Sequence, residues 1–243
     1  MNDDLDQLLV SLKMRPMREI VERELARAQK QKPSYTDFYA RLLREQLQLK
    51  KARSIEYRID CAKLPERWAL ETFPFSAQPG VHEPTLKQHA ELDFVAKKQN
   101  LVFIGKTGVG KTGLASALLL KALENGYRGL FVRAQDLFDE MYASLADRSS
   151  RKLLNRLITV DVLLIDEMGY LNLKPEQSNL FFKLMEERYS RKSTVITTNL
   201  DYDDWYGFLG RKEMVGALLD RLRHHCHTIR IDGPSLRSPS NGA

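Results

Sequence analysis

The chain has 243 residues, of which 43% are hydrophobic and 29% charged, and its formal net charge of +6 makes an anionic partner worth testing. This length holds one α/β domain with a small appendage, and it excludes two full-sized domains. Its two cysteines, Cys61 and Cys226, lie far apart in no metal-binding spacing, which excludes a disulfide framework or structural zinc site and favours a reducing cytoplasm.

The first 64 residues contain no glycine and are predicted to form helices. They open with acids, where a secretion signal would be basic. Leucines at positions 5, 8, 9 and 12 have helical spacing. Pro16 can open a second helix that runs to about Gln31, and Ser34 followed by Asp37 resembles the N-cap of a third. No apolar run here or later approaches the ~20 residues that a membrane span needs, so no membrane partner is expected.

The same region is basic. Between residues 13 and 63 there are 14 lysines and arginines against 7 acids, and some of the cations form a helical row at Lys50, Lys51, Arg53 and Arg58. The sequence therefore predicts a small, basic, all-helical N-terminal domain over residues 1–64. Its excess of positive charge favours an anionic partner.

A proline-containing segment, residues 65–84, is predicted to link this domain to an α/β core over residues 85–233. In the core, short β-rich runs alternate with helical stretches, the pattern of a parallel sheet with helices between its strands. The predicted strands are Leu101–Ile104, Leu130–Val132, Val160–Ile165, Thr194–Thr197 and Thr228–Ile231. Residues 234–243 are predicted to form a flexible tail.

Residues 105–112 match the phosphate-loop pattern G-x-x-x-x-G-K-[ST] at every fixed position, between a predicted strand and a predicted helix. Backbone N–H groups of such a loop cradle phosphates at a helix N-terminus. Lys111 is predicted to neutralise the β- and γ-phosphates of ATP, and Thr112 to ligate Mg²⁺. A chance glycine-rich turn is the alternative, which this setting disfavours. The loop consists of Gly105, Lys106, Thr107, Gly108, Val109, Gly110, Lys111 and Thr112.

Asp166 and Glu167 directly follow the third predicted strand. A carboxylate at that place can hold Mg²⁺ through its water shell, which is the role predicted for Asp166. Glu167 is placed to orient or deprotonate the attacking water, which favours ATP hydrolysis over transfer to another substrate. Acids that merely cap a strand are the alternative.

Two later positions are weaker candidates. Asn199, at the tip of the fourth strand, is predicted to contact the γ-phosphate and the attacking water, with Thr198 as the second choice and a turn-initiating Asn as the alternative. Arg221 ends a helix from which it cannot easily reach its own nucleotide, so it is predicted to serve a neighbouring subunit as an arginine finger. Arg223 is its rival, and a surface arginine paired with Asp220 is the alternative.

Together these segments resemble the IstB-type transposition helper ATPases, which are AAA+ proteins close to the DnaC helicase loaders. The resemblance rests on the phosphate loop, the D-E-x-G-Y-L segment at 166–171, the stretch 175–182, Thr198-Asn199 and residues 218–225, and it spans essentially the whole chain. It implies a parallel, five-stranded P-loop AAA+ core without a C-terminal lid. It also implies that Asn199 is the polar sensor and that Arg221 acts in trans.

The resemblance further implies a homo-oligomer that forms with ATP and Mg²⁺ on double-stranded DNA and recruits or stimulates a partner transposase. One departure concerns the segment after the last strand, where the family usually has G-x-S-Y-R and this chain has Leu236 before Arg237. The role of Arg237 therefore stays open. A DnaC-like helicase loader with the same ATPase residues is the competing hypothesis, and a nucleotide-gated binding module that hydrolyses little is a third.

Overall fold

The computed structural model describes residues 3–14, 16–169, 171–210 and 212–237. Tyr170 of the D-E-x-G-Y-L segment and the end of the predicted tail lie outside that part of the chain. The chain divides into two compact units, residues 1–57 and residues 58–243, and helix α3 (Tyr35–Ala62) runs across the division. Nowhere in the described ranges is a helix both long and apolar enough to cross a bilayer.

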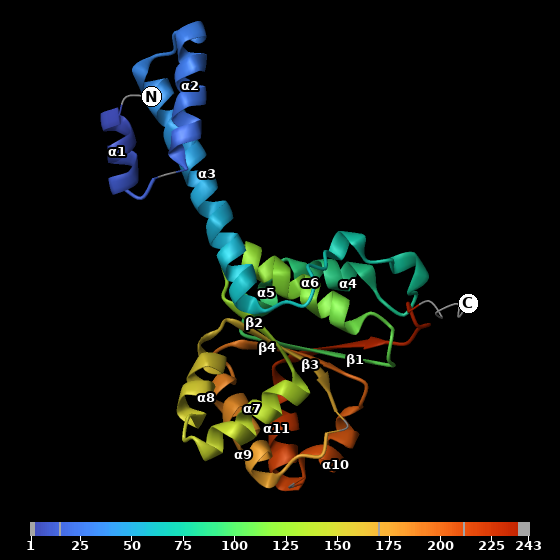
Figure 1. Ribbon diagram of the computed structural model, residues 1–243. Helices are drawn as coiled ribbons and strands as arrows, with labels where there is room; N and C mark the ends of the chain where they lie inside the picture. The colour runs from blue at the N-terminus through green and yellow to red at the C-terminus, as the bar shows by residue number, and fades with distance from the viewer. Residues whose placement is uncertain (1–2, 15, 170, 211, 238–243) are drawn as a thin grey trace, which may run out of the picture. The chain divides into compact units, whose positions relative to one another are not determined.

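Three helices build the first unit: α1 (Asp3–Ser11), α2 (Met17–Gln31) and the part of α3 up to residue 57 (Figure 1). Helix α3 begins after Ser34, as its cap predicts, because the Ser34 hydroxyl accepts a hydrogen bond from the Asp37 N–H at 3.1 Å. The helical character predicted for this region is confirmed. A small apolar core joins the helices, and its buried members are Leu9, Met17, Ile20, Val21 and Leu42.

Five parallel strands form one sheet in the second unit, in the order β2-β3-β4-β1-β5. Strand β4 lies between β1, which leads into the phosphate loop, and β3, which carries the two acids, so the predicted five-stranded P-loop arrangement is confirmed. Strands β1, β3 and β4 are covered on both faces, which explains their apolar runs. The strands are β1 (Asn100–Gly105), β2 (Gly129–Arg133), β3 (Val162–Met168), β4 (Ser193–Thr198) and β5 (Cys226–Ile231).

Helices cover both faces of the sheet (Figure 1). One face carries α4 (Glu83–Ala90), α5 (Asp93–Ala96) and α6 (Lys111–Glu124). Helix α6 is buried along most of its length, which explains its alanines and leucines. The other face packs the larger apolar core and carries α7 (Ala134–Ala146), α8 (Ser150–Thr159), α9 (Pro175–Arg188), α10 (Trp205–Leu209) and α11 (Lys212–His224).

Residues 65–84 and the segment after β5 both pack on the phosphate loop. The fully buried Gln78 donates from Nε2 to the Val109 carbonyl at 3.2 Å and to the Pro234 carbonyl at 2.9 Å. The Leu236 N–H donates to the Gly108 carbonyl at 2.8 Å. A flexible tail was expected from residue 234, but its described part is therefore fixed against the loop.

Arg188, the last residue of α9, is a buried cation at the amino ends of the central strands, where its side chain is 1% exposed. It donates to the Leu157 carbonyl at 2.7 Å and to the Thr194 hydroxyl at 3.0 Å. Burial lowers the pKa of Arg188 to about 9, although Asp161 opposes the shift. The group stays charged at neutral pH, so these bonds are charge-assisted and hold α8, α9 and β4 together.

Candidate active site

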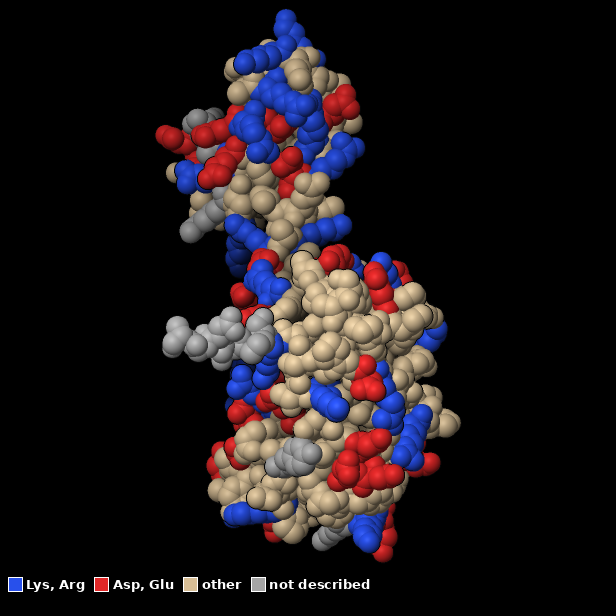
Figure 2. Space-filling view, turned by 90° about the vertical axis from the view of Figure 1, so that its right-hand side faces the viewer, with Lys and Arg blue, Asp and Glu red and all other residues tan. Residues whose placement is uncertain are grey.

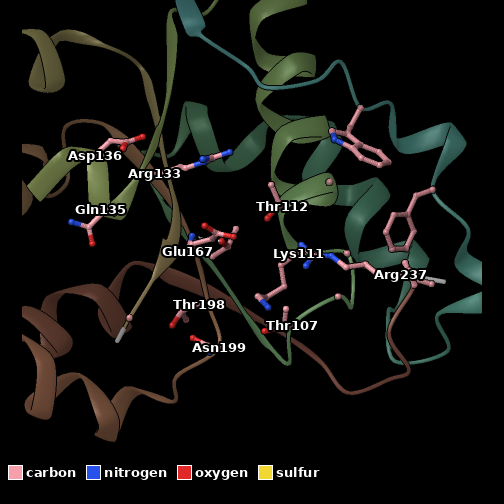
Figure 3. Close-up of a pocket in the computed structure, with 18 of the residues that line it drawn as sticks. Thr107, Lys111, Thr112, Arg133, Gln135, Asp136, Glu167, Thr198, Asn199 and Arg237 are labelled. Atoms are coloured by element: carbon pink, nitrogen blue, oxygen red, sulfur yellow. Dashed lines mark hydrogen bonds between the residues drawn. The ribbon is translucent and has the colours of Figure 1, made fainter. Parts of the chain in front are cut away.

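The carboxyl ends of the parallel strands meet at one edge of the sheet, and a cavity of about 710 Å³ opens there (Figure 3). Ligand pockets usually have volumes of roughly 300–1,000 Å³. The wall combines the phosphate loop after β1, the end of β3 and the tip of β4. It therefore brings together every predicted site segment except the one that contains Arg221.

The phosphate loop needs glycine at two positions because its backbone adopts positive φ there. Gly108 has φ +88° and Gly110 has φ +95°. A Cβ atom on Gly108 would lie 2.1 Å from Ser235 Oγ, and one on Gly110 would lie 2.7 Å from Phe73 Cε2. Any larger residue would be strained and would displace these neighbours. The loop then enters α6 at Lys111, where free helix N–H groups favour an anion.

The Lys111 ammonium lies at the base of the cavity. Its Nζ donates to the carbonyls of Gly105 and Lys106, both at 2.7 Å. Burial lowers the pKa of Lys111, and the carboxylates of Asp166 and Glu167 oppose that shift. Figure 3 shows Arg237 beside Lys111, and the proximity of this second cation lowers the pKa of Lys111 further. Two positive charges at this point suit a polyphosphate.

Asp166 is buried between two hydroxyl groups, and its side chain is 3% exposed. Thr112 Oγ1 donates to the Asp166 carboxylate, at 2.9 Å from Oδ1 and 3.2 Å from Oδ2. Thr197 Oγ1 donates to the same Oδ1 at 2.5 Å. The structure thus places the two predicted Mg²⁺ ligands in direct contact, and hard oxygen atoms of this kind are the ligands that Mg²⁺ prefers.

Glu167 is exposed to the cavity although its neighbour is buried. Its backbone has φ +59°, and the pairing of β3 with β4 shifts register between Ile165 and Met168. A left-handed conformation costs a residue other than glycine about 1–3 kcal/mol, so the surroundings must hold it. The result is that adjacent residues on one strand present one carboxylate to Thr112 and the other to the open cavity.

The tip of β4 contributes both predicted sensor residues to the cavity wall (Figure 3). Thr198 is fully buried, and its hydroxyl accepts a hydrogen bond from the Leu200 N–H at 3.0 Å. Asn199 is exposed, so its amide can reach a ligand in the cavity. This difference supports Asn199 over Thr198.

Arg221 and Arg223 lie on α11, and neither lines the nucleotide cavity of its own chain. The Arg221 guanidinium is 3.5 Å from the Glu186 carboxylate, whereas the sequence had suggested Asp220 as the alternative partner. The Arg223 guanidinium is 3.9 Å from Asp203. The expectation that Arg221 cannot serve its own nucleotide agrees with this position, and its action in trans stays a prediction.

Several cavity residues had no motif to mark them. Thr197 comes from within a buried strand, and two aromatic residues come from the segment predicted as a linker. Polar residues at the start of α7 line the side of the cavity near Glu167 (Figure 3). Their only sequence signal is their position beside strand ends or prolines. These additional wall residues are Trp68, Phe73, Arg133, Gln135 and Asp136. Leu236 and Arg237 also line the cavity, and they belong to the segment that the G-x-S-Y-R pattern had already marked.

Comparison with known proteins agrees with this geometry. Residues 7–241 match the family described as IstB-like ATP binding protein. The ATP-binding protein of insertion sequence IS21 from Pseudomonas aeruginosa is 36% identical over 96% of this chain and 88% of its own. That of IS5376 from Geobacillus stearothermophilus is 36% identical over 84% of this chain and 81% of its own.

Solved structures extend the comparison to the fold. The crystal structure of DnaI has a TM-score of 0.59 at 25% identity and covers 68% of this chain and 92% of its own. The crystal structure of the DnaC helicase loader has a TM-score of 0.54 at 26% identity, and it covers 62% of this chain and 88% of its own. The replication initiator DnaA, in a structure bound to AMPPCP and single-stranded DNA, has a TM-score of 0.60 at 21% identity. It covers 71% of this chain and 52% of its own. The fold is that of the AAA+ ATPases, and the chain belongs to the IstB-like ATP-binding protein family as an ATPase.

Proposed function

We propose that the protein uses ATP to assemble on double-stranded DNA and that the assembly recruits or stimulates a transposase. The observation that carries this proposal is the extent of the match to insertion-sequence proteins. The Pseudomonas aeruginosa relative aligns with 96% of the chain, which takes in the N-terminal helical unit as well as the ATPase core. Because these relatives are named as proteins of insertion sequences, transposition is the process that we assign.

Within the site, each residue receives one proposed role. Thr112 and Asp166 would hold Mg²⁺, which supplies positive charge against the phosphate oxygens when it is bound. Lys111 neutralises the β- and γ-phosphates from the base of the cavity. Glu167 orients the attacking water and accepts its proton. Asn199 contacts the γ-phosphate from the tip of β4, where it would detect hydrolysis.

The basic helices of the first unit are proposed to contact DNA phosphates. Figure 2 shows Lys and Arg side chains gathered over this unit, in the upper part of the view. Lys50, Lys51 and Arg53 are exposed on α3, and no carboxylate of the described residues pairs with them. Arg58, also predicted for this row, instead donates to the Leu123 carbonyl at 2.8 Å. Three cations of the row are therefore available to DNA.

Replacing Lys50, Lys51 and Arg53 together by Ala is expected to weaken DNA binding and flatten its salt dependence. Each neutralised phosphate contributes about 0.9 to the slope of log K against log salt, so the triple variant should lose about 2.7 from that slope. Fluorescence anisotropy of a labelled duplex, titrated with protein and a non-hydrolysable ATP analogue across a salt series, measures it.

The matched control removes three exposed lysines of the second unit, Lys98, Lys121 and Lys152. This control variant should keep most of the parental slope of log K against log salt. An equal loss in the control would place the DNA contacts outside α3. An affinity of the parent protein that does not change with salt would refute DNA as the partner.

Helicase loading is the second candidate, favoured by the likeness to DnaI and to the DnaC helicase loader at 25% and 26% identity. The ATPase residues would be the same in both functions, so the partner decides between them. Pull-down with a purified replicative helicase, in parallel with the transposase of an IS21-type element, separates the two. Capture of the helicase alone would replace transposition as the assignment.

Arg221→Ala is expected to leave ATP binding by the monomer unchanged and to remove the DNA-stimulated part of turnover. An arginine finger contributes about 10³–10⁵ in rate, and Arg221 lies outside its own nucleotide cavity. ATP turnover with and without duplex DNA measures the effect. Arg223→Ala is the control, because that guanidinium stacks on the Tyr202 ring at 4.9 Å. Parental DNA-stimulated hydrolysis in Arg221→Ala would refute the finger in trans.

A further inference from the structure

Thr197, in the buried strand β4, bonds to both acids of the neighbouring strand. The residue is fully buried in β4, and it lines the nucleotide cavity. Its hydroxyl donates to Asp166 Oδ1 at 2.5 Å and accepts from the Glu167 backbone N–H at 3.0 Å. A hydroxyl has one proton to give and lone pairs to receive. A carboxylate can only accept and an N–H can only donate. The Thr197 hydroxyl must therefore give its proton to Asp166 and accept the hydrogen bond from the Glu167 N–H.

The hydrogen bond from Glu167 to Thr197 stabilises the backbone at a residue with an unfavourable conformation. Glu167 has φ +59°, and β3 and β4 lose regular register next to it. A residue with a Cβ atom keeps a left-handed conformation only when its surroundings determine it. With its N–H held by Thr197, Glu167 turns its carboxylate into the cavity, as Figure 3 shows.

The bond to Asp166 completes a row of three side chains. Thr112 and Thr197 donate to the same carboxylate oxygen from opposite elements, α6 and β4. Two donors leave the Asp166 carboxylate little freedom to rotate. One hydroxyl on β4 thus determines the orientation of a carboxylate on one residue and the backbone of the next.

We propose that Thr197 is a positioning residue for ATP hydrolysis, which orients Asp166 toward Thr112 and holds Glu167 in the conformation that faces the attacking water. It acts through the two acids, and the inference rests on the roles proposed for them above. Partners of this kind, one step removed from a metal or a reacting group, usually contribute about 10–100-fold to activity or metal affinity.

Thr197→Val tests the proposal because valine keeps the shape of threonine and lacks the hydroxyl. We expect kcat to fall about 10–100-fold, because without the hydroxyl neither acid is held in its working orientation. A second readout needs no turnover: the gain in affinity for a fluorescent ATP analogue on adding Mg²⁺ should shrink, whereas the affinity without Mg²⁺ should not change.

Two further variants separate positioning from folding. Thr197→Ser restores the hydroxyl and should restore both readouts. Thr194→Val removes an equally buried hydroxyl from the same strand, one that accepts a bond from Arg188 instead. It should lower the melting temperature but keep kcat and the Mg²⁺ effect. Parental kinetics in Thr197→Val, failure of Thr197→Ser to recover, or an equal loss in Thr194→Val would each overturn the proposal.

Glu167→Gln, measured in the same assays, separates the positioning role of Thr197 from the proposed role of Glu167 on which it rests. If Glu167→Gln is slow and Thr197→Val is not, only the role of Thr197 fails. If Glu167→Gln turns over ATP at the parental rate, the proposed role of Glu167 fails and the positioning role falls with it. Slow hydrolysis in both variants, with recovery in Thr197→Ser, supports both.

Discussion

Lys111→Ala is expected to lose ATP binding, with affinity falling by a factor of about 100 to 4,000. The ammonium is half-buried at the base of the cavity, 2.7 Å from each of two loop carbonyls. Removing one partner of a buried charge pair costs about 3–5 kcal/mol, and every 1.4 kcal/mol is a factor of about ten in affinity. Isothermal titration calorimetry with a non-hydrolysable ATP analogue and Mg²⁺ measures the loss.

Lys121→Ala provides the matched control for this result. Lys121 is exposed near the other end of the same helix, α6, so its removal takes away one positive charge without touching the cavity. Its affinity for the analogue should equal that of the parent. Parental affinity in Lys111→Ala would contradict the assignment of the phosphate loop as the nucleotide site.

Glu167→Gln is expected to bind ATP normally and to slow hydrolysis by about 10²–10⁴, the usual contribution of a general base. Glutamine keeps the size of the side chain and loses the ability to accept a proton. The bond from Glu167 to the Thr197 hydroxyl uses the backbone N–H of Glu167 and not its side chain, so the local fold should be retained. Phosphate release under single-turnover conditions, with nucleotide affinity measured in parallel, tests both halves of the expectation.

The control for Glu167→Gln makes the same change at an exposed position away from the cavity. Glu176 lies in the first turn of α9, and Glu176→Gln should hydrolyse ATP like the parent. If Glu167→Gln lost nucleotide binding instead of turnover, the residue would have a binding role and the base would have to be sought elsewhere on the cavity wall.

The phosphate loop depends on two segments that lie far from it in sequence. Phe73 and Gln78 approach it from the segment before the core, and Ser235 and Leu236 approach it from the segment after β5. Both segments contact the loop through its backbone or its glycines. The shape of the nucleotide site is therefore set by residues outside the motif that defines it.

Local sequence was enough to predict the phosphate loop, the paired acids and all five strands. The reason is physical: positive φ selects glycine at Gly108 and Gly110, and strands covered on both faces require continuous apolar runs. The boundaries were less accurate. Strand β3 begins at Val162, two residues later than predicted, and it continues through both acids to Met168. Strand pairing decides such ends, and pairing partners are distant in sequence.

Only the tertiary structure could find the role of Thr197, the packing of Leu236 on the loop and the position of Arg221 outside its own cavity. Each is a contact between segments far apart along the chain, for example 31 residues between Thr197 and Asp166. Hydrophobic periodicity and motif spacing record which face of one element is buried. They carry no information on which two elements meet at an edge of the sheet, because that is decided by strand order and packing.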